Sequence, residues 1–157
     1  MGSAKPQGEF FDYIDIDAID NLRHCIKEAK HLPVANAPSR ASRAVSKGSV
    51  LFSLVRPYLE NIALVEEMHS HCIASTGFYV CNSSGVLTSQ FMFFLMISRY
   101  VIDGLNQYMK GDNSPSISKE NIENWLYPIP PIREQNAICT KVNVLFAIIE
   151  SIEKSLR

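Results

Sequence analysis

The chain lacks the features that mark the unusual classes of protein. Its 157 residues include only four cysteines, none of them in a CxxC pair, so no disulfide framework is expected. Hydrophobic residues make up 46% of the chain and charged residues 20%, close to the average for a folded globular protein. This composition excludes a disordered tail, a collagen-like rod and a low-complexity linker. The length fits one domain with a normal hydrophobic core.

Long hydrophobic runs are also missing. The longest covers residues 91–97 and resumes at Val101-Ile102, whereas a membrane-spanning helix needs about 20 apolar residues. No basic segment followed by an apolar one opens the chain, so we expect no secretory signal. We therefore expect a reduced, cytoplasmic protein without a membrane segment.

Sequence motifs for catalysis are absent as well. The chain contains no GxGxxG, GxxxxGK(S/T), HExxH or GxSxG pattern. His69, His71 and Cys72 form the only compact group of metal-ligand residues, but a zinc site needs three or four ligands and no further one stands at motif spacing. We interpret the two histidines as solvated loop residues. No catalytic residue, metal or cofactor is expected.

Charge is distributed unevenly, although the net charge is only −1. Residues 29–59 carry no carboxylate and five cations, which are Lys30, Arg40, Arg43, Lys47 and Arg56. Such a stretch favours an anion-facing surface, and chance clustering in a neutral protein is the alternative. In the acidic segment before it, Asp15 and Asp17 alternate with isoleucines. This alternation predicts the outer face of an edge strand rather than paired catalytic carboxylates.

Short hydrophobic segments predict a sheet. Strands are expected at residues 11–16, 50–55, 62–65 and 72–81, the last broken at Gly77. Residues 22–32 fit either a helix or a strand. Residues 33–47 have the composition of a loop.

Helical signals follow the expected strands. A long helix is predicted over residues 88–109, with Thr88 or Ser89 as its N-cap. Its first half is apolar on nearly every side, so we expect it to be buried against the sheet. Ser118 is placed to cap a short helical turn through Asn124. Together these elements predict an α+β fold in which a bent, mixed or antiparallel sheet packs against one long helix.

The clearest periodic signal lies after Pro131. Apolar side chains recur there at spacings of 4, 3, 4, 3 and 4 residues, at Ile138, Val142, Leu145, Ile149, Ile152 and Leu156. This is the heptad seam of a coiled-coil-forming helix. Because ordering a helix costs about 1–2 kcal/mol per residue, the seam needs a surface that covers it. That surface is either another helix or the chain's own domain.

Several fragments occur in an order that resembles a known family. They are Tyr13-Ile-Asp-Ile16, Ala37-Pro-Ser-Arg-Ala41, Gly48-Ser-Val-Leu-Phe-Ser53, Val55-Arg-Pro-Tyr-Leu59, Ser75-Thr-Gly-Phe78, the loop of residues 111–115 and Ile129-Pro-Pro-Ile-Arg-Glu-Gln135. Each fragment is weak alone, but their order is similar to that in the specificity subunits of type I restriction–modification enzymes. The resemblance covers nearly the whole chain from residue 9.

The resemblance implies a DNA target recognition domain at residues 9–130 and a conserved spacer helix at residues 131–157. In that family the domain reads one half of a split target, and the helix packs against a second such helix. The implied partners are methyltransferase and restriction subunits, which carry the chemistry. The chain has no internal repeat, so we expect a half-subunit or a fragment. It would pair with itself or with a second specificity half through the helix.

Eight residues are candidates for contact with double-stranded DNA. They are Arg40, Arg43, Lys47, Arg56, Tyr58, Lys110, Asn113 and Ser114. The cations suit phosphate or guanine. Arg56 lies in a motif that the family shares across different targets, so we expect it to position the backbone or a phosphate rather than read a base. Asn113 and Ser114 are either polar contacts or turn formers, and Tyr58 either contacts DNA or packs beside Pro57.

Two other functions stay open on this evidence from the residues. The chain is alternatively an assembly module that binds methyltransferase subunits and a second specificity half with little DNA contact. It is also consistent with the recognition domain of a fused methyltransferase–endonuclease. A small-molecule enzyme fits less well, because no catalytic constellation is present.

Overall fold

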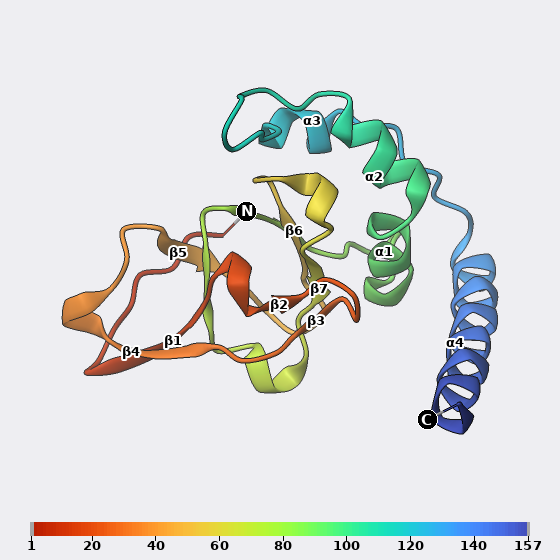
Figure 1. The fold of residues 1–157 in the computed structure, drawn as a ribbon, viewed down its shortest axis with the longest axis horizontal. Helices are drawn as coiled ribbons and strands as arrows, with labels where there is room; N and C mark the ends of the chain where they lie inside the picture. The colour runs from red at the N-terminus through yellow and green to blue at the C-terminus, as the bar shows by residue number, and fades with distance from the viewer. Residues whose placement is uncertain (1, 157) are drawn as a thin grey trace.

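The fold is that of a computed structural model, which describes residues 2–156 (Figure 1). Its strands are β1 (Phe10–Ile14), β2 (Ile19–Asp20), β3 (Cys25–Ile26), β4 (Lys30–Pro33), β5 (Ala41–Ala44), β6 (Val50–Ser53), β7 (Ile62–Leu64), β8 (Ile73–Ser75) and β9 (Phe78–Cys81). The α-helices are α1 (Ser89–Met96), α2 (Arg99–Asn106), α3 (Lys119–Glu123) and α4 (Ile132–Ser155). Short 3₁₀ turns are η1 (Ile16–Ala18), η2 (Val34–Asn36), η3 (Pro57–Leu59) and η4 (Glu67–His69).

The strands form three small sheets. A four-stranded sheet has the order β4-β1-β8-β5, a three-stranded sheet has the order β7-β6-β9, and β2 pairs with β3. β1 and β8 run parallel, with Tyr13 opposite Ile73, and the other pairs are antiparallel. The predicted α+β fold with mixed and antiparallel sheets is therefore confirmed.

β6 lies at the centre of the hydrophobic core. All of its residues are buried, and successive side chains of a strand point to opposite faces. Val50 and Phe52 join the hydrophobic cluster that α1 covers, whereas Leu51 joins a second cluster with Ile14 and Phe78. The unbroken apolar run is buried because it contributes to two cores at once.

The helix expected over residues 88–109 is divided into α1 and α2. Thr88 caps α1 by accepting a hydrogen bond from a backbone amide of the first turn, as predicted. Ser98 separates the two helices, since its hydroxyl donates to the Leu95 carbonyl and accepts from the Val101 amide. Both helices bury side chains in the same core, so the apolar pattern of the sequence continues across the break and gives no sign of it. The burial of α1 against β6 and β7 is confirmed.

Two expectations for the first half of the chain are wrong. Asp15 and Asp17 do not lie on an edge strand, because β1 ends at Ile14 and is paired with both β4 and β8. The Asp15 carboxylate instead accepts from the Ile16 amide and caps η1. Residues 33–47, expected to be a loop, contain β5. This strand is formed by its pairing with β8 far along the chain, which local composition does not reveal.

The shorter segments mostly follow the sequence signals. Residues 22–32, which fitted either helix or strand, contain β3 and β4. Ser118 opens α3 in a capping box with Asn121, as predicted from its position. No helix within residues 2–156 is both long enough and apolar enough to cross a bilayer.

The last helix stands at the side of the molecule. α4 follows Pro130-Pro131, and Pro131 is its N-cap. The helix begins beside α1 and its C-terminal half extends past the rest of the chain (Figure 1). The predicted long C-terminal helix is confirmed, and its two halves have different surroundings.

Candidate nucleic-acid interface

A polar loop with a fixed base follows α2. The Lys110 amide donates to the Ser116 carbonyl at 3.0 Å, and the Ser116 amide donates back to Lys110 at 2.9 Å. Gly111 has a φ of 100°, which favours glycine, so the chain turns directly after this base. We call residues 111–115 the tip. Its first four residues are exposed.

The tip is bound to the turn that follows β6. The Arg56 amide donates to the Pro115 carbonyl at 2.7 Å. The Arg56 guanidinium reaches further along the tip, where Nη2 donates to the Asn113 carbonyl at 3.0 Å and, more weakly, to Ser114 Oγ at 3.5 Å. In Figure 1 the yellow turn lies beside the teal loop that contains the tip. Two segments more than fifty residues apart therefore form one surface.

The turn after β6 is itself tightly held. Arg56 (φ 48°) and Glu60 (φ 56°) both adopt the left-handed conformation, one at each end of η3. For a residue other than glycine this costs about 1–3 kcal/mol and persists only where the surroundings impose it. Here Arg99 Nη1 pairs with Glu60 Oε1 at 2.8 Å, and Asn21 Nδ2 donates to the Leu59 carbonyl at 2.8 Å. The turn is thus fixed by contacts from two other segments.

The structure brings most of the predicted DNA-contacting residues together. Five lie on the turn or on the loop with the tip, and we call them the loop cluster: Arg56, Tyr58, Lys110, Asn113 and Ser114. Tyr58 is 46% exposed, so its ring is open to a partner rather than buried beside Pro57. The contact of these residues with DNA stays a prediction.

Arg40 precedes β5 of the four-stranded sheet, and the turn between β8 and β9 links it to the end of β6 that leads into the loop cluster. Its carbonyl accepts from the Thr76 amide, and the neighbouring Gly77 carbonyl accepts from the Leu54 amide, two residues before Arg56. Arg40 is exposed. Its position is therefore compatible with the same ligand surface.

Arg43 and Lys47 lie in different surroundings. Arg43 is half-buried on β5, and its Nε has no hydrogen-bond partner among the described residues. Lys47 precedes β6, at the end of that strand opposite to the loop cluster, and its hydrogen bond to Glu67 at 2.9 Å raises its pKa. Lys30 is likewise paired with Asp17 at 2.7 Å. The cationic stretch of the sequence is not one continuous surface, because two of its members face carboxylates.

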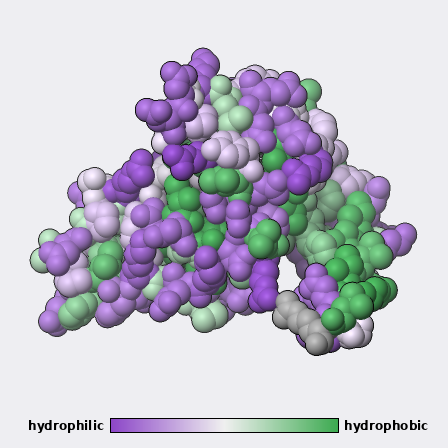
Figure 2. All heavy atoms as spheres, in the orientation of Figure 1, coloured by the Kyte–Doolittle hydropathy of each residue, from purple (hydrophilic) through white to green (hydrophobic). Residues whose placement is uncertain are grey.

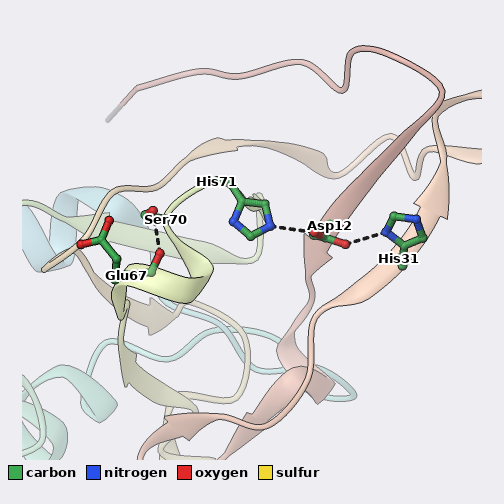
Figure 3. Close-up of polar contacts among 5 residues, drawn as sticks. All are labelled: Asp12, His31, Glu67, Ser70 and His71. Atoms are coloured by element: carbon green, nitrogen blue, oxygen red, sulfur yellow. Dashed lines mark hydrogen bonds and ion pairs between the residues drawn. The ribbon is translucent and has the colours of Figure 1, made fainter.

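A separate polar group joins β1, β4 and the segment before β8. The Asp12 carboxylate contacts His31 Nδ1 at 2.8 Å through one oxygen and His71 Nε2 at 2.7 Å through the other (Figure 3). These hydrogen bonds, that of His31 first, hold the pKa of Asp12 below its usual value. No group of three His, Cys, Asp or Glu residues in the described chain is arranged to hold a metal ion.

The expectation of solvated histidines is right for His71 and wrong for His69. His71 is exposed and bonded to Asp12. His69 ends η4 with only 9% of its surface exposed, because this turn directs the ring inward. Cys72 is buried as well, and burial raises its pKa to about 11.

The start of α4 is anchored by Gln135, which is fully buried. Its Oε1 accepts from the Thr88 amide at 2.9 Å, and its Nε2 donates to the carbonyls of Val86 and Pro130, both at 2.8 Å. Cys139 is buried one turn later. Gln135 thus joins α4 to the beginning of α1 and to the segment that leads into the helix.

The predicted seam of α4 is covered only at its beginning. Ile138 and Val142 are half-buried. The remaining seam residues are more than half exposed, and they are Leu145, Ile149, Ile152 and Leu156. Figure 2 shows hydrophobic side chains gathered along this part of the helix. Both predicted surroundings therefore occur, the chain's own domain for the first half and no covering surface in the described chain for the second.

Comparisons with known proteins agree with this architecture. The chain is 28% identical over 109 residues to the specificity subunit of the type I restriction enzyme EcoDI from Escherichia coli, which covers 69% of this chain and 23% of that protein. It superposes on the HsdS subunit from Thermoanaerobacter tengcongensis with a TM-score of 0.85 and 35% identity, over 92% of this chain and 38% of that one. A second structure, described as showing assembly and conformational transition of the type I restriction–modification system, gives a TM-score of 0.84 with the same identity and coverage. No protein-family model matches the chain.

The fold and the sequence are both similar to those of type I specificity subunits, so the resemblance predicted from the sequence is confirmed. The chain is similar to a part of such a subunit, since it spans less than two fifths of the solved chains and about a quarter of the E. coli protein.

Sequence reasoning does not find the residues that hold the loop cluster in place. Asn21 lies 38 residues from its partner Leu59, and Arg99 lies 39 residues from Glu60. Contacts of this range leave no local pattern. The buried Gln135 appears in the sequence analysis only as the last residue of a fragment that resembles the family. Its burial is not predicted, because a glutamine in the first turn of a helix is usually exposed.

Proposed function

We propose that the chain reads one half of a split double-stranded DNA target for a type I restriction–modification complex. The observation that carries the proposal is the similarity to HsdS over 92% of the chain at a TM-score of 0.85. Residues 9–130 form the recognition domain and residues 131–157 form the spacer helix. The chain itself is non-catalytic and acts in the cytoplasm, while methyltransferase and restriction subunits modify or cleave the DNA.

The loop cluster supplies the chemistry for this role. Lys110 provides positive charge for phosphate, and Asn113 and Ser114, beside Arg56, provide exposed donors and acceptors for base edges. Tyr58 offers a flat ring beside them. Arg40 adds a cation at the same end of the sheet, and no ion pair in the described chain involves Arg40, Arg56 or Lys110.

α4 supplies the connection to a second reading unit. Its exposed seam fits a helix with the same apolar pattern, from a second copy or from another specificity half. If the partner is a second copy, two-fold symmetry makes the DNA target an inverted repeat with a fixed gap.

Selection from a randomised duplex pool, with the chain alone and with a type I methyltransferase subunit added, tests the proposal. The expected result is enrichment of a short motif, present twice in inverted orientation if the chain pairs with itself. Binding of the selected duplex should weaken with salt, with a log–log slope of about −3.6 for four phosphate contacts. Absence of enrichment in both arms would overturn the proposal.

A second function is favoured by the exposed seam of α4. An assembly module that binds methyltransferase subunits and another specificity half needs such a surface and needs no loop cluster. The selection separates the two: an assembly module would bind the methyltransferase subunit in a pull-down with purified protein and would enrich no motif.

A further inference from the structure

We propose that Arg56 is a positioning residue, which holds the tip in the conformation that meets DNA instead of contacting DNA as its main task. This inference rests on the proposed DNA-reading function. It assigns a physical role to one residue of the loop cluster and makes the side chain of Asn113 the reading group that depends on it.

The geometry around Arg56 supports this role. Its backbone amide binds one end of the tip, at Pro115, and its guanidinium binds the middle, at the Asn113 carbonyl. Both acceptors are main-chain oxygens, and the guanidinium donates to the second of them through Nη2. A loop closed only at its base by Lys110 and Ser116 would otherwise leave the tip free to move.

The backbone of Arg56 supports the same conclusion. A left-handed arginine is strained, and the contacts that hold Glu60 and Leu59 fix the turn in that strained form. The strained turn directs the guanidinium toward the tip. Strain of this kind is concentrated where a side chain must be held in one orientation.

The residue that this arrangement positions is Asn113. Its backbone carbonyl accepts from Arg56 while its side chain is exposed, so the side-chain amide is presented to a ligand. An asparagine amide pairs with the major-groove edge of adenine through two hydrogen bonds. We therefore assign to Asn113 the reading of an adenine and to Arg56 the positioning of that asparagine.

Three variants of Arg56 separate positioning from phosphate contact. Arg56→Gly removes the guanidinium and suits the left-handed backbone, so the turn keeps its shape. Arg56→Ala also removes the guanidinium, but alanine does not favour the left-handed backbone conformation as glycine does. Arg56→Lys keeps the charge but has no planar fork and reaches less far toward the tip. Arg40→Ala is the matched control, because it removes an exposed cation at the same end of the sheet that has no hydrogen bond to the tip.

Two readouts are measured on the full chain. The first is the affinity for the selected duplex and for a scrambled duplex at several salt concentrations. The second needs no DNA: it is the hydrogen exchange and the ¹⁵N relaxation of the amides of residues 112–114. Thermal unfolding shows whether each variant is folded.

Arg56→Gly, Arg56→Ala and Arg56→Lys should each reduce the ratio of selected to scrambled binding by about tenfold, the discrimination of a base contact. Asn113→Ala should give the same loss, and the double variant Arg56→Gly with Asn113→Ala should lose no more than either single variant. The salt slope for Arg56→Lys should stay unchanged and the amides of the tip should become mobile. Arg40→Ala should leave the tip as it is.

Other outcomes would overturn the inference. A uniform loss of affinity for both duplexes in Arg56→Gly, restored by Arg56→Lys and with a slope smaller by about 0.9, would make Arg56 a phosphate contact. An immobile tip in Arg56→Gly would exclude positioning directly. If the unaltered chain prefers no sequence, the proposed function itself fails, and the mobility of the tip still decides whether Arg56 restrains it.

Discussion

The two halves of α4 carry similar hydrophobic patterns but lie in different surroundings. In the first half, Gln135 and Cys139 are buried and Ile138 is half-buried against the core that α1 covers. In the second half, Leu145 and Ile149 are more than half exposed. The difference arises because α4 begins beside α1, whereas its C-terminal half extends past the rest of the chain (Figure 1). The helix therefore packs on its own domain at its beginning and leaves its later seam residues uncovered.

This comparison shows that a heptad pattern alone does not identify the surface that covers a helix. The same period continues from the half that packs on α1 into the half that extends past it. The polar residue Gln135 distinguishes the two halves, because its hydrogen-bonded side chain fixes the first half of α4 to the domain. The second half has ring contact with the domain through Phe94 and Phe146, whose centroids are 6.0 Å apart.

The largest effect is expected from the uncovered face. Replacing Leu145, Ile149 and Ile152 by glutamine keeps helix propensity and removes the apolar seam. If a second helix covers these half-exposed residues, the association should weaken by about 2–4 kcal/mol, or ~30- to 1000-fold in dissociation constant. Sedimentation equilibrium of the chain measures it. Val144→Gln, an exposed apolar residue off the seam, is the control, and equal association of the triple variant and the unaltered chain would contradict the prediction.

The next effect is expected from the anchored half. Gln135→Ala leaves the Thr88 amide and two carbonyls without their partner in a buried place, and each such group costs about 1–3 kcal/mol. We expect the free energy of unfolding to fall by about 2–4 kcal/mol in urea denaturation. The exposed neighbour gives the control Asn136→Ala, with a change below ~0.5 kcal/mol. A loss in Gln135→Ala no larger than in the control would show that Gln135 does not fix α4.

A smaller effect is expected where the two halves meet. Phe146→Ala removes the ring contact with Phe94, and an aromatic pair contributes about 0.5–1.5 kcal/mol beyond its buried area. Because Phe146 is 46% exposed, a total loss of ~1–2 kcal/mol in thermal unfolding is expected. Ile148→Ala, at a similarly exposed position, should change stability less. Equal losses in the two variants would mean that the domain contact ends before residue 146.

The smallest effect is a dependence on pH. Burial raises the pKa of Cys139 above the ordinary value of 9.0. The folded thiol therefore keeps its proton at pH values where the unfolded chain loses it. The contribution of this thiol to the free energy of unfolding is complete below pH 9 and declines as the pH rises above 9. Alkylation by iodoacetamide, followed by mass spectrometry from pH 7 to 10, measures the difference. The exposed Cys25 should react well before the buried Cys139, and similar rates for the two would contradict the burial of the first half of α4.

Part of this structure could be predicted from local sequence. β6 was visible as an unbroken apolar run before Pro57, and α3 as a short segment after a capping serine. The start of α1 at Thr88 followed from the same capping chemistry. These signals are local, because each depends on residues within a few positions of one another.

The remaining features depend on contacts between distant segments. The division at Ser98 is invisible in the hydrophobic pattern, since the residues on both sides face one core. β5 exists through its pairing with β8. The ion pair of Lys47 with Glu67 and the bond from Arg56 to Asn113 join residues that only the folded chain brings together. The candidate DNA-contacting residues could thus be proposed from the sequence, but their arrangement in the folded chain could not.

The nearer of the two acceptors of the Arg56 guanidinium on the tip is the backbone carbonyl of Asn113, and every amino acid supplies such a carbonyl. A substitution at position 113 therefore changes an exposed side chain, the one proposed to read DNA, while the bond to the backbone of that residue is retained. The residue that holds the tip and the residue whose side chain is exposed are therefore different ones. On the proposed role of Asn113, a library of chains that differ only at position 113 should contain variants with altered sequence preference, without redesign of the fold.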